Sequence, residues 1–285
     1  MRIGIVGYGV VGRAIARFFE RSHEIVVFDK YLADFSSTER RASINKCELV
    51  FVCVPTPTTP QGLAADMSAV FETAQWVQVP MCIRSTILPG TTETLIAQTG
   101  KSIAFSPEYL GEAPTHPWRC EQNCGFVIVG GTNLMAERVF SAYRPMVPRD
   151  FRFVQTDATT AELCKYMENC FLATKVAFVN QFYDIACRLR VDFEQLRALW
   201  LLDQRVGYSH TTVTRERGFG GRCLPKDVQA LVTLMGQNGS APLLEAVLAY
   251  NNALRSKDLQ NASAAPAPAV PVPSDTKSLA RVRTA

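Results

Sequence analysis

The chain of 285 residues has no long apolar run, and none approaches the ~20 residues that a helix needs to cross a bilayer. It has no marked excess of charge either: 30 Lys and Arg are set against 26 Asp and Glu, and the formal net charge of +4 is scattered along the sequence. A protein that neutralises many phosphates carries a clustered basic face. The first residues lack a signal-peptide layout, since they run directly into patterned structure. We therefore expect a protein of the cytoplasm with neither nucleic acid nor membrane among its partners.

The composition suits neither disorder nor a disulfide framework. With 47% hydrophobic and 20% charged residues, the chain is long and apolar enough to bury a sizeable core. Its nine cysteines are an odd number spread through a long chain, which favours thiols in a reducing compartment. Most should be small buried hydrophobic side chains. A reactive cysteine must be identified by its surroundings, because thiolate forms only with local help.

Up to residue 156, short apolar runs alternate with amphipathic helical patterns. Several runs are nearly continuous, as in strands buried on both faces, and the helical patterns include residues 10–20, 67–77 and 134–143. This alternation predicts an α/β fold, a doubly wound parallel sheet of the Rossmann type, for residues 1–156. The expected strands are residues 3–6, 25–28, 49–54, 81–83, 103–105, 126–129 and 151–154.

A mostly helical second domain is expected after residue 156. Residues 158–190 repeat apolar side chains at helical spacing with no Gly or Pro, which predicts one long helix with Thr156 or Asp157 as its N-cap. Further helical patterns cover residues 193–202, 227–235 and 242–254. We therefore place a helical domain at 157–260. Residues 261–285 are rich in Ala, Pro and Ser, so we expect a disordered tail.

The segment Gly7-Tyr-Gly9-Val-Val-Gly12 lies between the first expected strand and the first expected helix. In such a loop the first Gly permits a tight turn, the second lets a pyrophosphate approach the backbone, and the third lets helix and strand pack closely. The second strand is followed by Asp29, where a carboxylate accepts hydrogen bonds from ribose hydroxyls and repels a 2′-phosphate. The motif predicts an NAD site. The alternative is a glycine-rich turn with no ligand.

A second glycine-rich segment precedes a cysteine and reads Gly218-Phe-Gly-Gly221-Arg-Cys223-Leu-Pro-Lys226-Asp227. Glycines let the backbone come close to a substrate, and a helix that starts beside the cysteine would stabilise its thiolate through the helix dipole. Cys223 is therefore the candidate nucleophile. The alternative is a structural cysteine in a glycine turn.

Lys165 and Asn169 lie four residues apart in the expected long helix and so share one face. Together they could present an ammonium and an amide to one oxygen atom. The alternative is a solvated helix surface, because Lys and Asn are mostly exposed in proteins.

One cluster has a weak likeness to a metal site. His116, Cys120 and Cys124 repeat every four residues, so a helix there could direct all three toward one Zn²⁺. The Cys spacing is unusual and no fourth ligand is evident. We therefore predict no metal.

In their order along residues 1–254, the motifs resemble the nucleotide-sugar 6-dehydrogenase family, which includes UDP-glucose and GDP-mannose dehydrogenases. Members of this family usually continue into a third domain that holds the nucleotide, whereas this sequence continues into the Ala/Pro-rich tail. The matching elements are Gly7 to Gly12, Val54-Pro-Thr56-Pro, Arg84-Ser-Thr86, Ser106-Pro-Glu108-Tyr109-Leu110-Gly-Glu112, Lys165 to Asn169, Phe171-Leu-Ala-Thr-Lys175, Asp203 to Gly207 and Gly218 to Asp227.

The resemblance implies an NAD-dependent enzyme that oxidises a sugar C6 alcohol to a carboxylate through a thiohemiacetal and a thioester, with UDP-glucose as the first-choice substrate. Thiolate addition to an aldehyde and stabilisation of the resulting alkoxide are chemically reasonable for these residue types. The implied catalytic residues are Cys223 as nucleophile, Lys165 and Asn169 for the alkoxide, Asp227 for water or the C6 hydroxyl, and Glu108 and Thr86 for the hydrolytic water.

The resemblance also implies the ligand contacts and the assembly. The implied NAD contacts are Gly7, Gly9, Val11, Gly12, Asp29, Thr56, Thr86, Glu112 and Lys226. The implied substrate contacts are Glu108, Tyr109, Leu110, Glu112, Lys165, Asn169, Phe219 and Gly220. A homodimer through the central helical domain is expected. Two alternatives stay open: a catalytically silent NAD-binding subunit or regulator derived from the family, and a dehydrogenase of GDP-mannose or UDP-N-acetylmannosamine.

Overall fold

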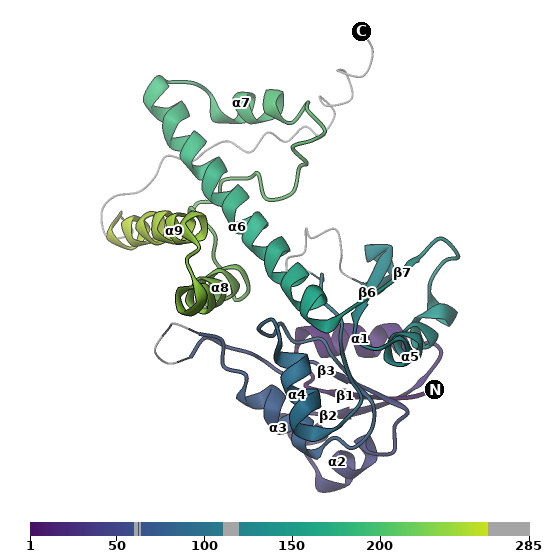
Figure 1. Cartoon of the computed structure of the whole chain (residues 1–285). Coiled ribbons are helices and arrows are strands. Elements are labelled where there is room, and N and C mark those ends of the chain that lie inside the picture. The colour runs from purple at the N-terminus through teal and green to yellow at the C-terminus, as the bar shows by residue number, and fades with distance from the viewer. Residues whose placement is uncertain (60–61, 63, 111–119, 262–285) are drawn as a thin grey trace.

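The structure is a computed structural model that describes residues 1–59, 62, 64–110 and 120–261 (Figure 1). Its N-terminal part is a seven-stranded sheet with the strand order β2-β1-β3-β4-β5-β6-β7. All seven expected strands are confirmed. They are β1 (Arg2–Val6), β2 (Glu24–Phe28), β3 (Leu49–Val52), β4 (Met81–Ile83), β5 (Ile103–Phe105), β6 (Phe126–Gly130) and β7 (Arg152–Thr156).

Helices cover both faces of the sheet, which explains the continuous apolar character of its central strands. One face packs against α1 (Val10–Phe19) and α5 (Asn133–Tyr143) in a core that includes Phe19, Phe51 and Tyr143. The other face packs against α2 (Thr38–Ile44), α3 (Ser68–Trp76) and α4 (Thr91–Thr99). Short 3-10 turns are η1 (Ala33–Phe35), η2 (Glu121–Cys124) and η3 (Arg144–Met146).

The sheet departs from the expected parallel arrangement at one place. β6 runs antiparallel to β5 through the pair Phe105↔Gly130, whereas β1 to β5 are mutually parallel and β7 is parallel to β6. Parallel neighbours need a crossover connection, usually a helix. The described part of the β5–β6 connection contains only η2, while α5 supplies the crossover between β6 and β7. The expectation of an all-parallel sheet was therefore wrong for β6 and β7.

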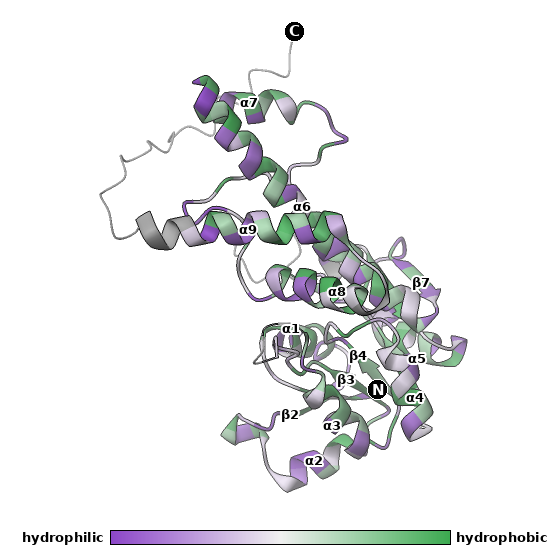
Figure 2. Ribbon diagram, turned by 60° about the vertical axis from the view of Figure 1, so that its left-hand side comes forward, coloured by the Kyte–Doolittle hydropathy of each residue, from purple (hydrophilic) through white to green (hydrophobic). Residues whose placement is uncertain are grey.

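The long helix is confirmed as α6 (Ala158–Leu189), 32 residues in length, and its N-cap is Asp157, whose carboxylate accepts from the Thr160 N–H at 2.8 Å. It is followed by α7 (Phe193–Trp200), α8 (Leu224–Asn238) and α9 (Pro242–Asn261). Helices α8 and α9 lie beside the middle of α6, between α7 and the sheet (Figures 1 and 2). Buried side chains of α6, α8 and α9 form a second core.

Two sets of contacts between the helical part and the sheet part involve the start of α6. Tyr166 of α6 and Ala230 of α8 pack against Ala65 in a small apolar cluster. The Glu162 carboxylate of α6 accepts hydrogen bonds from the N–H groups of Gly90 at 2.6 Å and Thr92 at 2.9 Å, at the start of α4. A carboxylate at a helix N-terminus satisfies otherwise unpaired N–H groups and the helix dipole. These contacts fix the first turns of α6 relative to the loops that follow β4.

Among the described residues, no helix combines the length and the apolar character needed to span a bilayer. All nine cysteines belong to the described part of the chain, and none forms a disulfide. The expected disordered tail lies outside the described residues, except for residue 261, which ends α9.

Candidate active site

The glycine loop after β1 has three differently constrained glycines. A Cβ at Gly7 would lie 2.6 Å from the Cys53 carbonyl oxygen, and one at Gly12 would lie 2.0 Å from the Gly7 carbonyl oxygen. A Cβ at Gly9 would have no atom within 4 Å. Gly9 is the N-cap of α1, and the first turn of this helix contains no acidic side chain. The space above Gly9 and the N–H groups of α1 therefore fit the pyrophosphate of a dinucleotide.

Asp29 lies directly after β2, beside the glycine loop. Its Oδ2 accepts from the Tyr8 N–H at 2.7 Å, and its Oδ1 accepts from the N–H groups of Tyr31 and Leu32 at 2.9 and 3.2 Å. An ionised carboxylate has about four acceptor positions. The partly exposed Asp29 therefore fixes the loop and retains an acceptor position for a ribose hydroxyl. Lys30 forms an exposed ion pair with Glu72 at 3.0 Å.

The other predicted NAD contacts of the sheet lie at the carboxyl ends of its strands, where ligands of doubly wound folds bind. Val11 is in the first turn of α1 and is partly buried against the core. The buried Thr56 hydroxyl donates to the Thr86 carbonyl oxygen at 2.8 Å, which ties the loop after β3 to the loop after β4. Glu112 lies outside the described residues, so its predicted contacts remain predictions.

Cys223 is the N-cap of α8, which continues with Leu224 and Pro225 in its first turn. Its side chain is exposed. Burial, by contrast, raises the pKa of Cys82 and of Cys170 to about 12. Thiols of that kind do not form thiolate at neutral pH. Exposure and the position at a helix N-terminus therefore distinguish Cys223 from the buried cysteines.

Asp227, one turn into α8, connects this helix, whose N-cap is Cys223 and which is called the cysteine helix below, to the long helix α6. It is fully buried, its Oδ2 accepts from Asn169 Nδ2 at 2.6 Å, and its Oδ1 accepts from Lys226 Nζ. Asn169 is 5% exposed and Lys165 is 8% exposed. The alternative of a solvated helix surface is therefore wrong for this pair, because both side chains face the packed side of α6.

Lys165 does not share a partner with Asn169 in this structure. Its ammonium donates to Glu168 Oε2 at 3.3 Å and lies 4.8 Å from the ring centre of Tyr109, a cation–π distance. An ammonium has three donors, so these contacts hold Lys165 beside the β5–β6 connection while leaving capacity for a substrate oxygen. The predicted substrate residue Tyr109 thus lies directly against a predicted catalytic residue.

Glu108 is held from two sides. Its Oε2 accepts from Arg84 Nη2 at 3.0 Å, and its Oε1 accepts from the Leu110 N–H at 2.5 Å. Glu108 is buried. The motif Arg84-Ser-Thr86 was part of the family resemblance, but no role was predicted for the Arg84 side chain. A fully buried guanidinium requires nearby carboxylates. Arg84 directly follows a buried strand, so a carboxylate partner such as Glu108 could have been predicted from the sequence.

Two predicted substrate residues, Phe219 and Gly220, lie in the loop of residues 218–223 that leads to Cys223, called the cysteine loop below. The Phe219 side chain lies in the core of the helical part, and its backbone N–H and carbonyl pair with Asn251 at 2.6 and 3.1 Å. A Cβ at Gly220 would lie 2.9 Å from Arg255 Nη1. Both backbone groups of Phe219 are therefore used to fix the loop to Asn251 of α9.

No group of three or more His, Cys, Asp or Glu side chains could hold a metal ion in the part of the chain that the structure describes. His116 of the considered zinc cluster lies outside that part. Cys120 packs against the sheet core, and burial raises the pKa of Cys124 to about 12.

The fold and the site together define a two-part dinucleotide-binding protein, in which a Rossmann-type sheet is joined to a helical part that carries an exposed cysteine. Residues 32–146 match the NAD binding domain, and residues 159–253 the central domain, of the UDP-glucose/GDP-mannose dehydrogenase family. The chain belongs to this family. The match to an NAD binding domain confirms NAD as the predicted cofactor.

Individual relatives agree with this assignment. The chain is 31% identical to UDP-glucose 6-dehydrogenase of Rickettsia felis over 226 residues, which cover 73% of this chain and 48% of the relative. It is 32% identical to UDP-glucose 6-dehydrogenase of Pseudomonas aeruginosa over 232 residues, or 74% of this chain and 49% of the relative. The chain thus spans about half the length of these curated relatives.

A solved structure gives the same picture for the fold. A UDP-glucose dehydrogenase from the hyperthermophilic archaeon Pyrobaculum islandicum superposes with a TM-score of 0.75 at 26% identity, covering 88% of this chain and 68% of that one. The arrangement of sheet and long helix is therefore that of nucleotide-sugar dehydrogenases.

Proposed function

We propose that the protein oxidises the C6 alcohol of a nucleotide sugar to a carboxylate with NAD as oxidant, and that UDP-glucose is its substrate. The observation that carries the proposal is that α8 carries an exposed Cys223 at its start and, one turn later, Asp227, whose carboxylate accepts from Asn169 of the long helix at 2.6 Å. Residues 1–156 would act as the NAD-binding domain and residues 157–260 as the helical domain that supplies the nucleophile.

Bound NAD supplies a hydride acceptor. The C6 alcohol would first lose its hydroxyl proton to a base and a hydride to the cofactor, which gives the aldehyde. The Cys223 thiolate would then add to the aldehyde and form a thiohemiacetal, which would lose a second hydride and a proton to become a thioester. Lys165 and Asn169 donate hydrogen bonds to the oxygen that carries the developing charge. Water then cleaves the thioester, so that the carboxylate leaves and the thiol is restored. The two hydrides would pass to two NAD molecules, one for each oxidation.

The remaining side chains hold water and protons. Buried Asp227, fixed by Asn169 and Lys226, would take the proton of water or of the C6 hydroxyl. Glu108 and Thr86 would hold the hydrolytic water, and Lys226 would also contact NAD. Substrate contacts would come from Tyr109, Leu110, Phe219 and Gly220.

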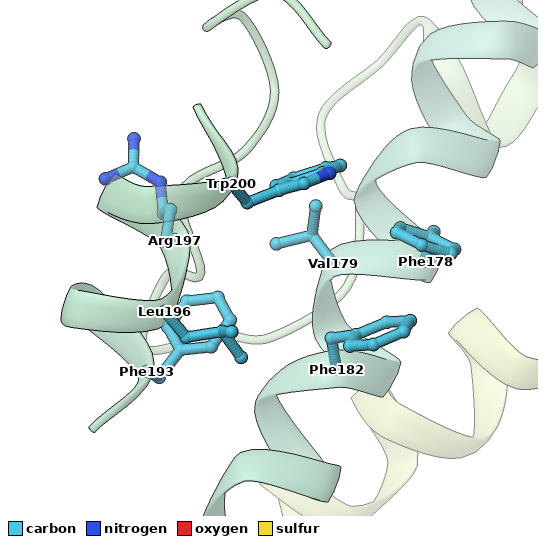
Figure 3. A pocket seen from close by; sticks show the side chains of 7 residues that line it. All are labelled: Phe178, Val179, Phe182, Phe193, Leu196, Arg197 and Trp200. Atoms are coloured by element: carbon cyan, nitrogen blue, oxygen red, sulfur yellow. The ribbon is translucent and has the colours of Figure 1, made fainter. Parts of the chain in front are cut away.

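The long helix also supports a homodimer through the central helical domain. Large apolar side chains are exposed along one face of α6 at helical spacing, and exposed apolar surface of this extent marks an interaction site. Between α6 and α7 lies an apolar cavity of about 250 Å³, lined mainly by aromatic side chains such as Phe182 and Trp200 (Figure 3). The exposed apolar residues of α6 are Leu163, Met167, Phe171, Phe178, Phe182, Ile185 and Leu189.

The stoichiometry of NADH tests the proposal. Purified protein is incubated with NAD and limiting UDP-glucose, and the expected yield is two NADH per sugar. One NADH per sugar would mean that oxidation stops at the aldehyde. GDP-mannose and UDP-N-acetylmannosamine are tested in parallel, and turnover of one of them alone would change the substrate. No NADH with any of the three would favour the catalytically silent NAD-binding subunit. None of the nine cysteines forms a disulfide, which agrees with a reducing compartment, and we propose that the protein works in the cytoplasm.

A further inference from the structure

Three charged side chains meet behind the candidate site, although the proposed reaction uses only Glu108. Arg84 Nη2 donates to Glu108 Oε2 at 3.0 Å and to Glu121 Oε1 at 2.5 Å, and Nη1 donates to Ser106 Oγ at 2.6 Å. The other oxygen of Glu121 accepts from the Tyr143 hydroxyl at 2.8 Å. All five side chains are buried. One nitrogen of one guanidinium thus serves two carboxylates that come from different parts of the chain.

The charges of this cluster do not balance when both carboxylates are ionised. One guanidinium and two carboxylates leave an excess negative charge in a buried place, which is costly unless a proton neutralises it. Burial raises the pKa of Glu121 to about 7, and the charge of Glu108 acts in the same direction, whereas Arg84 and the Tyr143 hydrogen bond oppose the change. The titratable groups that face Glu121 are Cys82 of β4, Arg84 directly after β4, Glu108 after β5, Cys124 of η2, Cys53 after β3 and Tyr143 of α5.

We propose that Arg84 and Glu121 are a positioning pair for Glu108, and that the proton on Glu121 decides whether the Arg84 guanidinium serves both carboxylates or Glu108 alone. The inference rests on the proposed function in so far as Glu108 acts on the hydrolytic water. With Glu121 protonated, Glu108 is the sole anionic partner of Arg84. With Glu121 ionised, the guanidinium charge is shared, and Glu108 is less firmly held.

The variant Glu121→Gln imitates the protonated state at every pH. It keeps the size of the side chain and a carbonyl oxygen that accepts from Arg84 Nη2, and its amide can donate to the Tyr143 oxygen. Tyr143→Phe removes the hydrogen bond that favours the ionised carboxylate, so it raises the pH at which Glu121 loses its proton. Glu137→Gln is the matched control, because Glu137 is an exposed carboxylate of α5 paired with Arg144 at 2.8 Å.

The first measurement does not depend on turnover. Infrared titration of protein labelled with ¹³C-glutamate follows the protonated carboxyl band, and the Glu108 carboxylate band is assigned by difference with Glu108→Gln. We expect a wild-type carboxyl band that is lost around pH 7, absent in Glu121→Gln, moved to higher pH in Tyr143→Phe and unchanged in Glu137→Gln. The Glu108 band should shift together with this titration in wild type and stay constant in Glu121→Gln. If the Glu108 carboxylate band keeps its position while Glu121 titrates in wild type, the proposal is overturned.

The second measurement is the pH dependence of kcat for the nucleotide sugar. We expect an inflection around pH 7 in wild type and none in Glu121→Gln, whose kcat should stay at the acid-side value of wild type while KM changes less than twofold. A purely structural role would lower kcat without removing the inflection. An unchanged inflection in Glu121→Gln would refute the pairing. If wild type forms no product, the proposed function fails, and the infrared shift of Glu108 alone decides on the positioning pair.

Discussion

The glycine loop allows a ligand role to be separated from a packing role by two substitutions three residues apart. Alanine at Gly9 meets no atom within 4 Å of its Cβ, and the backbone there has φ −77°, which alanine adopts readily. Alanine at Gly12 places its Cβ 2.0 Å from the Gly7 carbonyl oxygen, far inside van der Waals contact. Gly9→Ala should therefore fold and lose NAD, whereas Gly12→Ala should lose the fold of the loop.

The magnitudes follow from these distances. At an N-cap, Ala is less favourable than Gly by about 0.5–1 kcal/mol, so the Tm of Gly9→Ala should fall by no more than about 4 °C. A phosphate oxygen that accepts from an N–H of this loop lies about 3 Å from the nitrogen and would meet the new methyl group. We expect the Kd for NAD to rise at least tenfold, which corresponds to about 1.4 kcal/mol. Gly12→Ala should cost at least about 2 kcal/mol of stability, because backbone atoms must move.

The assay combines isothermal titration with NAD and thermal unfolding followed by circular dichroism. Gly90→Ala is not a suitable control, because Gly90 has φ +89°. Gly236→Ala in α8 is suitable, since a Cβ there meets no atom within 4 Å and alanine favours the helix. An unchanged Kd in Gly9→Ala would refute the assignment of the pyrophosphate to this loop. Equal losses of stability in both loop variants would show that the distinction between the two glycines is wrong.

Three further predictions concern the nucleophile, the helix anchor and the dimer. Cys223→Ser should abolish NADH formation while NAD binding stays unchanged, and undiminished turnover would remove Cys223 from the mechanism. Glu162→Ala leaves two N–H groups and the Thr92 hydroxyl without their buried acceptor and should cost about 3 kcal/mol in denaturant unfolding; the exposed Glu93→Ala should cost less than about 1 kcal/mol. Phe171→Glu should convert a dimer into a monomer in sedimentation equilibrium, whereas Leu134→Glu, on the exposed surface of α5, should leave the dimer intact. If both variants stay dimeric, the interface does not include this face of α6.

Local patterns predicted most of the fold because the relevant forces act over short stretches of chain. The strands of the sheet are near-continuous apolar runs, and α6 has neither Gly nor Pro in 32 residues. The direction of β6 could not be read in the same way. Whether Phe105 pairs with Gly130 in a parallel or antiparallel sense depends on the connection between them, and no hydrophobic period records it.

In the candidate site, too, the features set by nearby residues were predicted from the sequence, and the contacts between distant residues were not. The spacing of Lys165 and Asn169 predicted a shared helix face, and glycines marked the loop before Cys223. The hydrogen bond between Asn169 and Asp227 joins residues 58 positions apart, and the contact of Arg84 with Glu121 joins residues 37 apart. Such contacts arise from tertiary packing. A sequence pattern can show that a buried Arg84 needs an anionic partner, but it does not show which glutamate supplies the charge.

The unbroken length of α6 accounts for the way these distant contacts meet at one place. Glu162 attaches the helix to the start of α4, and Asn169 lies seven residues further on, where it reaches Asp227 of the cysteine helix. Asn180, eleven residues beyond, accepts from the Gly218 N–H at 3.1 Å and so holds the loop that leads to Cys223. In an α-helix, one residue more or less between two such groups turns one of them by about 100° around the axis. The absence of Gly and Pro from this segment therefore does more than favour a helix: it keeps the anchor, the amide and the cysteine loop in register with one another.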